Sequence, residues 1–367
     1  MNLKNQGASI LLWSLAVISA VAAEQQAIQG PGCQREECVP VSDCPPLRDR
    51  LLESPTEESF KEIRRLTCFI RKWRPWICCP PALPPRPTPP KLTQSLLPND
   101  CGFSSYVPVA EGEEVPLNSY PWNAVLQYKD ISKGKLNTDR VHCSGSVIND
   151  RYVLVPAQCA FKNLTVDRGL ELVEVLVGEW DTSTDPDCTN GSRRRHACAP
   201  PVQRFAVEEV TLHPDFFARG VLSDDLALLR LRRPIDFKAA AGFIRPVCLP
   251  RVDSPAEVVL ADGAILTSWN ATSHRPRNHI LSYVDKATCD KVLRDTFVNE
   301  QICMQVAQGP PDFSAVRGGP LMVYDAKRYS YTQFGILIGK SRNSDILPGL
   351  FTYIPPYVQW IEETLRP

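Results

Sequence analysis

The sequence predicts an all-β double barrel preceded by a small disulfide-rich domain. Six of the fourteen cysteines fall between Cys33 and Cys79, in a segment too short to bury much apolar area without cross-links. Eight prolines between positions 80 and 100 exclude a helix or a central strand and predict a semi-extended linker. From Cys101 onward, short apolar runs alternate with turn residues, as in an all-β double barrel. We therefore expect a small domain over residues 24–79, a linker over residues 80–100 and a barrel domain over residues 101–367.

The first 23 residues have the composition of a secretory signal. Lys4 supplies the positive start, residues 8–22 form the apolar run, and the small residues from Ala20 to Ala23 form a cleavage site. The alternative, an N-terminal anchor, requires a longer apolar run. No later run of that length lacks charges, so we expect no membrane span in the mature protein. A secreted chain meets an oxidising compartment, where an even number of cysteines can pair completely.

The overall charge identifies no partner. Lysine plus arginine total 41 and aspartate plus glutamate total 41, and a neutral secreted chain gives no indication of nucleic-acid binding. One local exception is the run over residues 70–76, Ile-Arg-Lys-Trp-Arg-Pro-Trp, which interleaves cations with two indoles. Because arginine stacks on tryptophan, this run predicts either a partner-docking face or two rings packed inside the small domain.

Several patterns with a common interpretation are spread along the second domain. The segment from Ala315 to Leu321 reads Ala-Val-Arg-Gly-Gly-Pro-Leu and precedes an apolar strand. The others are Tyr120-Pro121-Trp122, the Cys143–Asn149 segment, Val155–Cys159, Ser223–Leu231, Pro246–Pro250 and the closing Tyr357–Ile361 segment. Over residues 101–367 they resemble the chymotrypsin-like serine proteases, which implies a double six-stranded β-barrel with a C-terminal helix. The cysteine spacing C-x4-C-x5-C-x23-C-x9-C-C resembles the clip domain of arthropod proteases.

The resemblance places the catalytic positions, and the chain departs from the family at most of them. Arg317 stands at the nucleophile position, and a guanidinium has no nucleophilic lone pair at neutral pH. Gln158 stands at the general-base position, and an amide does not take up a proton near neutral pH. Pro311 replaces the pocket-floor carboxylate. Asp225 matches the third triad residue, but without an imidazole to orient it has no catalytic task. The resemblance therefore implies a pseudoprotease.

The activation signal of the family is also missing. Alignment on Tyr120-Pro121-Trp122 places the new N-terminus of a cut zymogen at Val109, but the preceding residue is Pro108 and not lysine or arginine. Val316 replaces the aspartate that would pair with that terminus, and Ala315 replaces a glycine of the oxyanion hole. We therefore expect the barrel to form without an activating cut.

The resemblance also implies a disulfide pattern that uses all fourteen cysteines. The implied bridges are Cys33–Cys78, Cys38–Cys68, Cys44–Cys79, Cys101–Cys248, Cys143–Cys159, Cys188–Cys198 and Cys289–Cys303. The family's bridge beside the specificity pocket is missing at both ends, since Phe313 occupies one position and no cysteine follows Cys303.

Exposed basic residues offer other sites for processing. The candidates are Arg86 and Lys91 in the linker and Arg193, Arg194 and Arg195 in the Cys188–Cys198 loop. The linker is favoured, because proline-rich chain is accessible to a protease. A linker cut would free the small domain, whereas a cut in the loop would leave two pieces joined by a disulfide, and gels run with and without reductant separate the two. The arginine run has two other interpretations, a docking cluster and an unused solvated tip.

Two further kinds of surface site are candidates. Carboxylates that suit calcium precede the arginine run at Glu179, Asp181, Asp185 and Asp187, although an acidic turn is the favoured interpretation. No other cofactor is expected. Glycosylation acceptors of the form Asn-x-Ser/Thr begin at Asn163, Asn190 and Asn270, and we expect one or more of them to be used.

Three functions remain for comparison. The favoured one is implied by the resemblance: a non-catalytic cofactor or regulator in arthropod haemolymph that docks clip-domain proteases or zymogens such as prophenoloxidase, in melanisation or antimicrobial signalling. The second is recognition of microbial surfaces by the same scaffold. The third, an active endopeptidase, needs a nucleophile such as Ser314 or Ser144, but neither His142 nor His213 lies in the base loop.

Overall fold

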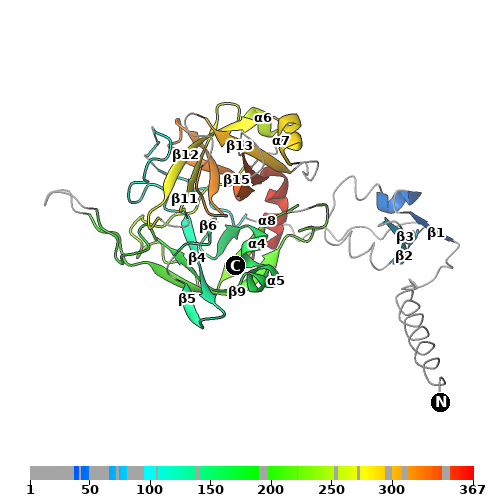
Figure 1. The fold of residues 1–367 in the computed structure, drawn as a ribbon, viewed down its shortest axis with the longest axis horizontal. Helices are drawn as coiled ribbons and strands as arrows, with labels where there is room; N and C mark the ends of the chain where they lie inside the picture. Colours follow the sequence, from blue (N-terminus) through cyan, green and yellow to red (C-terminus); the bar gives the residue numbers. More distant parts are fainter. Residues whose placement is uncertain are drawn as a thin grey trace, which may run out of the picture. The chain divides into compact units, whose positions relative to one another are not determined.

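A computed structural model describes the chain over residues 37–40, 43–48, 66–71, 74–80, 95–104, 106–108, 110–137, 140–189, 197–220, 222–251, 255–270, 273–293, 300–307, 313–340 and 348–367. The chain divides into two compact units, residues 1–90 and residues 91–367. Figure 1 shows both units, coloured along the sequence. The predicted signal lies outside the described residues, and the predicted domain boundaries stay a prediction. Among the described helices, none is long and apolar enough to cross a membrane.

The smaller unit contains a three-stranded antiparallel sheet. Its strands are β1 (Cys38–Pro40), β2 (Thr67–Arg71) and β3 (Arg74–Cys78), in the order β1-β3-β2. Disulfides join Cys38 to Cys68 and Cys44 to Cys79 across a core that includes the buried Ile77. Cys78 is also disulfide-bonded, and its expected partner Cys33 lies outside the described residues. The cross-links compensate for this small apolar core by restricting the unfolded chain.

The larger unit begins with a barrel that is closed by pairing of its first and fifth strands in chain order. Its strands are β4 (Asn123–Asp130), β5 (Lys135–Asn137), β6 (Cys143–Val147), β7 (Tyr152–Val155), β8 (Leu170–Val177), β9 (Gln203–Leu212) and β10 (Ala227–Leu231). The sheet order is β5-β4-β6-β7-β10-β9-β8, and β4 also pairs with β8. With β5 as a short extension, the other six strands close the barrel. Two short helices, α4 (Ala157–Ala160) and α5 (Lys162–Asp167), follow β7.

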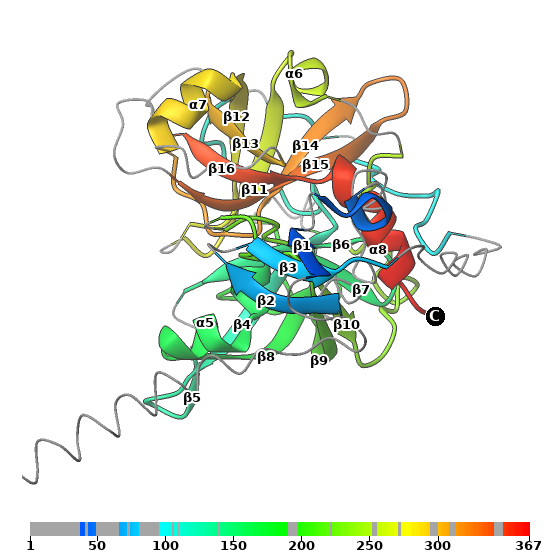
Figure 2. The ribbon, with the colours of Figure 1, turned by 90° about the vertical axis from the view of Figure 1, so that its right-hand side faces the viewer.

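The second barrel consists of six strands. They are β11 (Ala264–Ser268), β12 (Arg277–Val284), β13 (Gln301–Val306), β14 (Pro320–Asp325), β15 (Ser330–Lys340) and β16 (Gly349–Tyr353), closed in the order β11-β12-β13-β16-β15-β14. Two short helices, α6 (Ala256–Val259) and α7 (Lys286–Leu293), lie in its connections. Figure 2 shows this barrel, yellow to red, stacked on the green strands of the first. The predicted double six-stranded barrel is confirmed.

Aromatic side chains join the two barrels. Trp122, next to β4, is fully buried and lies 5.7 Å from the ring of Tyr331 in β15. Tyr120 contacts the same Tyr331 ring edge-on at 5.5 Å. Burying a ring of this size contributes about 2–3 kcal/mol, so the Tyr-Pro-Trp pattern marks the contact that fixes one barrel against the other.

The chain ends in the predicted helix. A 3-10 turn, η3 (Pro355–Tyr357), leads into α8 (Val358–Thr364). Ile361 and the C-cap residue Leu365 are spaced four residues apart, so they lie on one side of the helix, and both are buried in a core cluster that holds most apolar side chains of the first barrel and several of the second. The last segment of the second barrel is thereby packed on the first.

Four disulfides cross-link the larger unit. They are Cys101–Cys248, Cys143–Cys159, Cys188–Cys198 and Cys289–Cys303. No free cysteine occurs among the described residues. Cys101–Cys248 spans the longest stretch of chain, a separation of 147 residues, and fastens the segment after the linker to the barrel.

Candidate functional site

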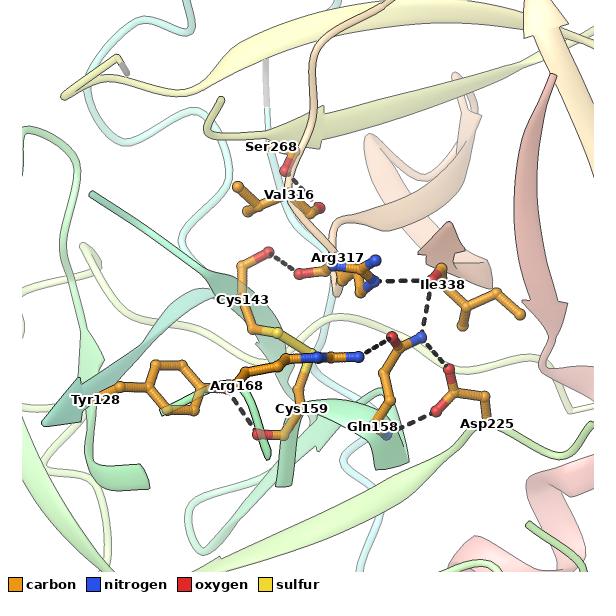
Figure 3. The surroundings of a disulfide bond; sticks show 11 residues. Tyr128, Cys143, Gln158, Cys159, Arg168, Asp225, Ser268, Val316, Arg317 and Ile338 are labelled. Atoms are coloured by element: carbon orange, nitrogen blue, oxygen red, sulfur yellow. Dashed lines mark hydrogen bonds between the residues drawn. A yellow bond between two sulfur atoms is a disulfide. The ribbon is translucent and has the colours of Figure 1, made fainter. Parts of the chain in front are cut away.

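Gln158 lies between the two barrels with its amide fully engaged. It belongs to α4, directly after the buried strand β7, and is 1% exposed. Its backbone N–H donates to Asp225 Oδ1 at 2.8 Å, and Nε2 donates to Asp225 Oδ2 at 2.5 Å and to the Ile338 carbonyl at 2.8 Å. Figure 3 shows these bonds around the Cys143–Cys159 disulfide. Both amide hydrogens are therefore used, and the side chain holds the first barrel to β15 of the second.

Arg317 reaches the same carbonyl from the other barrel. Its Nε donates to the Ile338 carbonyl at 3.2 Å, while its own carbonyl accepts from the N–H and hydroxyl of Ser144 at 2.8 and 3.3 Å. The structure thus brings together Gln158, Asp225 and Arg317, the three positions that the sequence singled out (Figure 3). Arg168, which the sequence did not single out, adds a bond from Nη2 to Gln158 Oε1 at 3.3 Å.

Two of the residues considered for an alternative catalytic pair, Ser144 and His213, make other contacts in the described part of the chain. Ser144 is buried, and its hydroxyl donates to the Arg317 carbonyl. His213 packs against the rings of Tyr357 and Trp360 at 5.0 and 4.9 Å. Ser314 is exposed three residues before Arg317.

Asp225 is fully buried, and burial raises the pKa of its carboxyl to about 7. Hydrogen bonds from Gln158 and the charge of Arg317 act in the opposite direction. Because the pKa in the folded state exceeds the ordinary value of 3.8, the folded chain binds this proton more tightly than the unfolded chain does. The stability that Asp225 contributes is therefore present at low pH and lost as the pH rises from about 4 to about 7.

Arg317→Gln is expected to lower stability in a pH-dependent way. Without the cation the pKa of Asp225 rises further, so the deficit relative to the unchanged protein should be smallest near pH 4 and should grow to about 1 kcal/mol at pH 8. Thermal melts across this range measure it. Arg140→Gln, an exposed neighbour, is the control and should show no such trend. A deficit that is the same at pH 4 and pH 8 would contradict this electrostatic role.

Val316 lies in an apolar cluster beside this network. Its side chain is 7% exposed and packs with Val125, Val141, Leu176 and Trp269. Its backbone is held on both sides, since its N–H donates to the Trp269 carbonyl at 2.8 Å and its carbonyl accepts from Ser268 Oγ at 3.1 Å. The Ala315–Gly318 loop is thus ordered in the uncut chain.

The segment that follows Pro108 is also fixed on the second barrel. Glu111 binds the ring of His279 at 2.6 Å and the N–H of Ile280 at 2.7 Å. The Gly112 N–H donates to the Asn278 carbonyl at 2.9 Å. Val109 itself lies outside the described residues. The residues shortly after it run beside β12 and are hydrogen-bonded to that strand.

The region of the expected specificity pocket contains an aromatic ring and a lysine. Phe313 is 2% exposed, and the Lys340 ammonium donates to its carbonyl and lies 5.2 Å from its ring centre. Gly349 faces this ring closely, because a Cβ there would come within 2.6 Å of it. Pro311 lies outside the described residues.

Three of the four carboxylates considered for calcium, those of Asp181, Asp185 and Asp187, accept hydrogen bonds from other groups of the chain. Asp187 accepts the N–H groups of Trp180 and Asp181 at 2.9 and 3.0 Å, and Asp181 pairs with Arg275 Nε at 2.7 Å. Burial raises the pKa of Glu179 to about 8. Among the described residues, no three or more such side chains are grouped to hold a metal ion. Asp185 accepts the Val202 N–H, and calcium binding at these residues stays a prediction.

Several of the glycosylation and processing sites expected from the sequence lie outside the described residues. Asn190, Arg86, Lys91 and the run of Arg193, Arg194 and Arg195 all do. Asn163 is exposed in α5, whereas Asn270 Oδ1 accepts the Ser273 N–H at 2.5 Å. Trp76 in β3 is partly buried, and Trp73 lies outside the described residues, so the two interpretations of the basic-aromatic run stay open.

Comparison with known proteins assigns both units to families. The trypsin family profile matches residues 109–361, and the regulatory CLIP domain of proteinases matches residues 29–79. The chain belongs to the clip-domain serine protease family. Its relatives in this family include CLIP domain-containing serine protease B10 of Anopheles gambiae, 31% identical over 96% of this chain and 97% of that protein. Phenoloxidase-activating factor 1 of Holotrichia diomphalia is 28% identical over 97% of this chain and 98% of that protein.

A solved clip-domain protease has the same architecture. The crystal structure of the Drosophila Grass clip serine protease of the Toll pathway matches with a TM-score of 0.63 and 28% sequence identity. It covers 89% of this chain, and this chain covers 93% of it. The likeness extends over almost the full length of both.

Proposed function

We propose that this clip-domain family member is a secreted, non-catalytic homologue that acts as a cofactor or regulator in an extracellular innate-immune protease cascade. The observation that best supports a loss of catalysis concerns Gln158 and Arg317. Gln158 donates both amide hydrogens, one to Asp225 and one to the Ile338 carbonyl, and Arg317 occupies the nucleophile position beside it. An amide cannot act as a general base, and a guanidinium cannot attack a carbonyl. Peptide hydrolysis by this site therefore lacks both of its chemical steps.

The uncut barrel supports the same proposal. In an active relative, the aspartate at the Val316 position pairs with the N-terminus that the activating cut frees. Here Val316 is held instead by apolar packing and backbone hydrogen bonds. The chain after Pro108 is already bound to β12 through Glu111 and Gly112. A protein that reaches this arrangement without a cut suits a binding role, available as soon as it is secreted.

The cascade is inferred from the relatives. One is named a phenoloxidase-activating factor, and the Grass protease belongs to the Toll pathway. We infer that the partners are clip-domain proteases or their zymogen substrates, such as prophenoloxidase, in haemolymph. A pull-down from haemolymph with and without microbial polysaccharide checks this. Capture of cascade proteins without polysaccharide supports the proposal, and capture that requires polysaccharide would favour microbial-surface recognition instead.

The purified protein is expected to hydrolyse no peptide or ester substrate and to take up no fluorophosphonate label. Arg317→Ser alone should not restore either, because Gln158 still provides no base. Labelling is measured by in-gel fluorescence, with bovine trypsin as the positive control. Stoichiometric labelling of the unchanged protein would overturn the proposed loss of catalysis.

A further inference from the structure

A cleft of about 690 Å³ lies beside the Cys101–Cys248 disulfide of the larger unit. Its walls come mainly from four parts of the chain, which are residues 97–101, residues 247–251, strand β15 and helix α8. The disulfide and a backbone bond hold these parts together, since the Gln333 N–H in β15 donates to the Cys248 carbonyl at 2.9 Å. The cleft is therefore preformed, and none of its described lining residues belongs to the network around Gln158.

Much of the lining is apolar. Its apolar members include the buried Val247 and Leu249 and the partly buried Leu97, Phe334 and Val358. Covering partly buried apolar surface removes it from water and favours association. The lining therefore favours a ligand with apolar side chains, whereas a sulfated sugar chain would leave this surface uncovered.

The two carboxylates of the described lining already accept hydrogen bonds. Asp325 Oδ1 accepts the backbone N–H groups of Lys327 and Arg328 at 2.9 and 3.3 Å, within the turn between β14 and β15. Glu362 Oε1 accepts the Ser95 hydroxyl at 2.7 Å. Each carboxylate is thus partly satisfied by the chain itself.

The two guanidinium groups of the described lining are less satisfied. Arg251 donates one hydrogen bond, from Nη2 to Asn99 Oδ1 at 2.5 Å. Arg328 is exposed, and within the described part of the chain its guanidinium makes no hydrogen bond or ion pair. A guanidinium has five N–H donors, so most of the donors of these two groups are open to a ligand. The group that complements them is a carboxylate, which can accept two parallel N–H bonds.

An exposed aromatic residue follows Arg328 in a strained backbone conformation. Tyr329 is 65% exposed and has φ of +49°, a region that bulky residues rarely adopt. Phe103 is 42% exposed and forms a β-bridge to Ser330, so a second exposed aromatic residue lies beside the same turn. Strained residues are often kept at ligand-binding positions. Tyrosine and arginine are also the residues that contribute most where proteins dock.

We propose that this cleft, with the turn of Arg328 and Tyr329, docks a peptide segment of a partner protein in which carboxylates alternate with apolar side chains. The apolar side chains of the segment cover Phe334 and Val358. Its carboxylates pair with Arg251 and Arg328, beside the ring of Tyr329. The inference rests on the partner-binding role in the proposed function, but it does not depend on the loss of catalysis.

Fluorescence anisotropy of the full chain tests the chemistry of the partner. The probe is a fluorescein-labelled peptide of alternating leucine and glutamate. One control peptide replaces each glutamate with lysine, and the other replaces each leucine with serine. The probe should bind about tenfold more tightly than either control, and its affinity should fall as salt is raised from about 20 to about 150 mM. Equal binding of the probe and either control would overturn the proposal.

Substitution of the two arginines locates the binding. Arg328→Gln should weaken it about threefold, and Arg328→Gln combined with Arg251→Gln about tenfold. Arg140→Gln is the matched control, because it removes an exposed cation beside the Ala315–Gly318 loop, and it should change nothing. Weaker binding to Arg140→Gln but not to Arg328→Gln would place the peptide beside that loop and overturn the assignment. So would heparin binding that depends on Arg328 when the peptide does not bind.

Tyr329→Gly separates docking from stability. Glycine adopts φ of +49° without strain and the ring is mostly exposed, so the melting temperature should not fall, whereas peptide binding should weaken about threefold. Phe217→Gly is the control, since Phe217 is also an exposed aromatic residue with positive φ but lies between β9 and β10, and it should leave binding unchanged. Full affinity of Tyr329→Gly would contradict the part assigned to this turn.

The haemolymph pull-down separates this inference from the proposed function. If Arg251→Gln combined with Arg328→Gln captures as much cascade protein as the unchanged protein does, the docking surface is wrong and the proposed function stands. If the unchanged protein binds the acidic peptide through Arg328 but captures no cascade protein, the proposed partners are wrong and the docking surface stands.

Discussion

Val316→Asp is expected to destabilise the larger unit by about 3–5 kcal/mol at pH 8, the cost of an unpaired charge in a buried site. The side chain would enter the apolar cluster of Val125, Val141, Leu176 and Trp269. Burial would raise the pKa of the new carboxyl, so lowering the pH should restore part of the loss. Denaturant unfolding at pH 8 and pH 5 measures both effects.

The control for this substitution is Val316→Thr, which is similar in size and polar but carries no charge. Its loss should be about 1–2 kcal/mol and should not change with pH. If Val316→Asp were as stable as Val316→Thr at pH 8, a cation would have to reach the site. The account of a barrel ordered without a freed N-terminus would then be wrong.

Gly318→Ala is expected to cost a similar amount, about 3–5 kcal/mol, for a steric reason. Gly318 has φ of +94°, and a Cβ there would overlap the carbonyl oxygen of Ser144. Ser144 belongs to β6, and its own N–H donates to the Arg317 carbonyl. The loop therefore cannot move aside without breaking its contact with the first barrel. Thermal and denaturant unfolding measure the loss.

Gly134→Ala separates backbone strain from the clash. Gly134 also has a positive φ, +64°, but a Cβ there would meet nothing within 4 Å. Its substitution should cost only about 1 kcal/mol. Equal losses at the two positions would show that the overlap with Ser144 contributes nothing.

These glycines explain how far the sequence could predict the fold. The Gly-Gly-Pro-Leu half of the pattern is kept because Gly318 and Gly319 meet backbone from the facing strands, and Pro320 begins β14. Packing demands of this kind persist whatever the site does, so the double barrel could be predicted from the sequence. The Ala-Val-Arg half occupies the positions that take part in catalysis in the family, and it is the half that departs from the family pattern.

The contacts of the site could not be predicted from the same patterns. Nothing in the sequence indicates that Gln158 and Arg317 share the Ile338 carbonyl, because the three residues come from separate segments and meet only through the fold. The pairing of Glu111 with His279 spans 168 residues and follows no local pattern. The spacing of the carboxylates before the arginine run likewise does not reveal that backbone N–H groups and Arg275 bind them.

The apolar cluster around Val316 also limits how this site can change over evolutionary time. An aspartate at position 316 could pair with a freed N-terminus only if position 108 also held a cleavable residue. Until position 108 changes, that aspartate lowers the stability of the fold. Serine at 317 without histidine at 158 gains no chemistry and removes a charge that favours ionised Asp225. On the proposed loss of catalysis, a lineage returning to hydrolysis would have to pass through less stable intermediates that gain no activity. Under the proposed loss of catalysis, selection acting on single substitutions therefore works against a return to hydrolysis at this site.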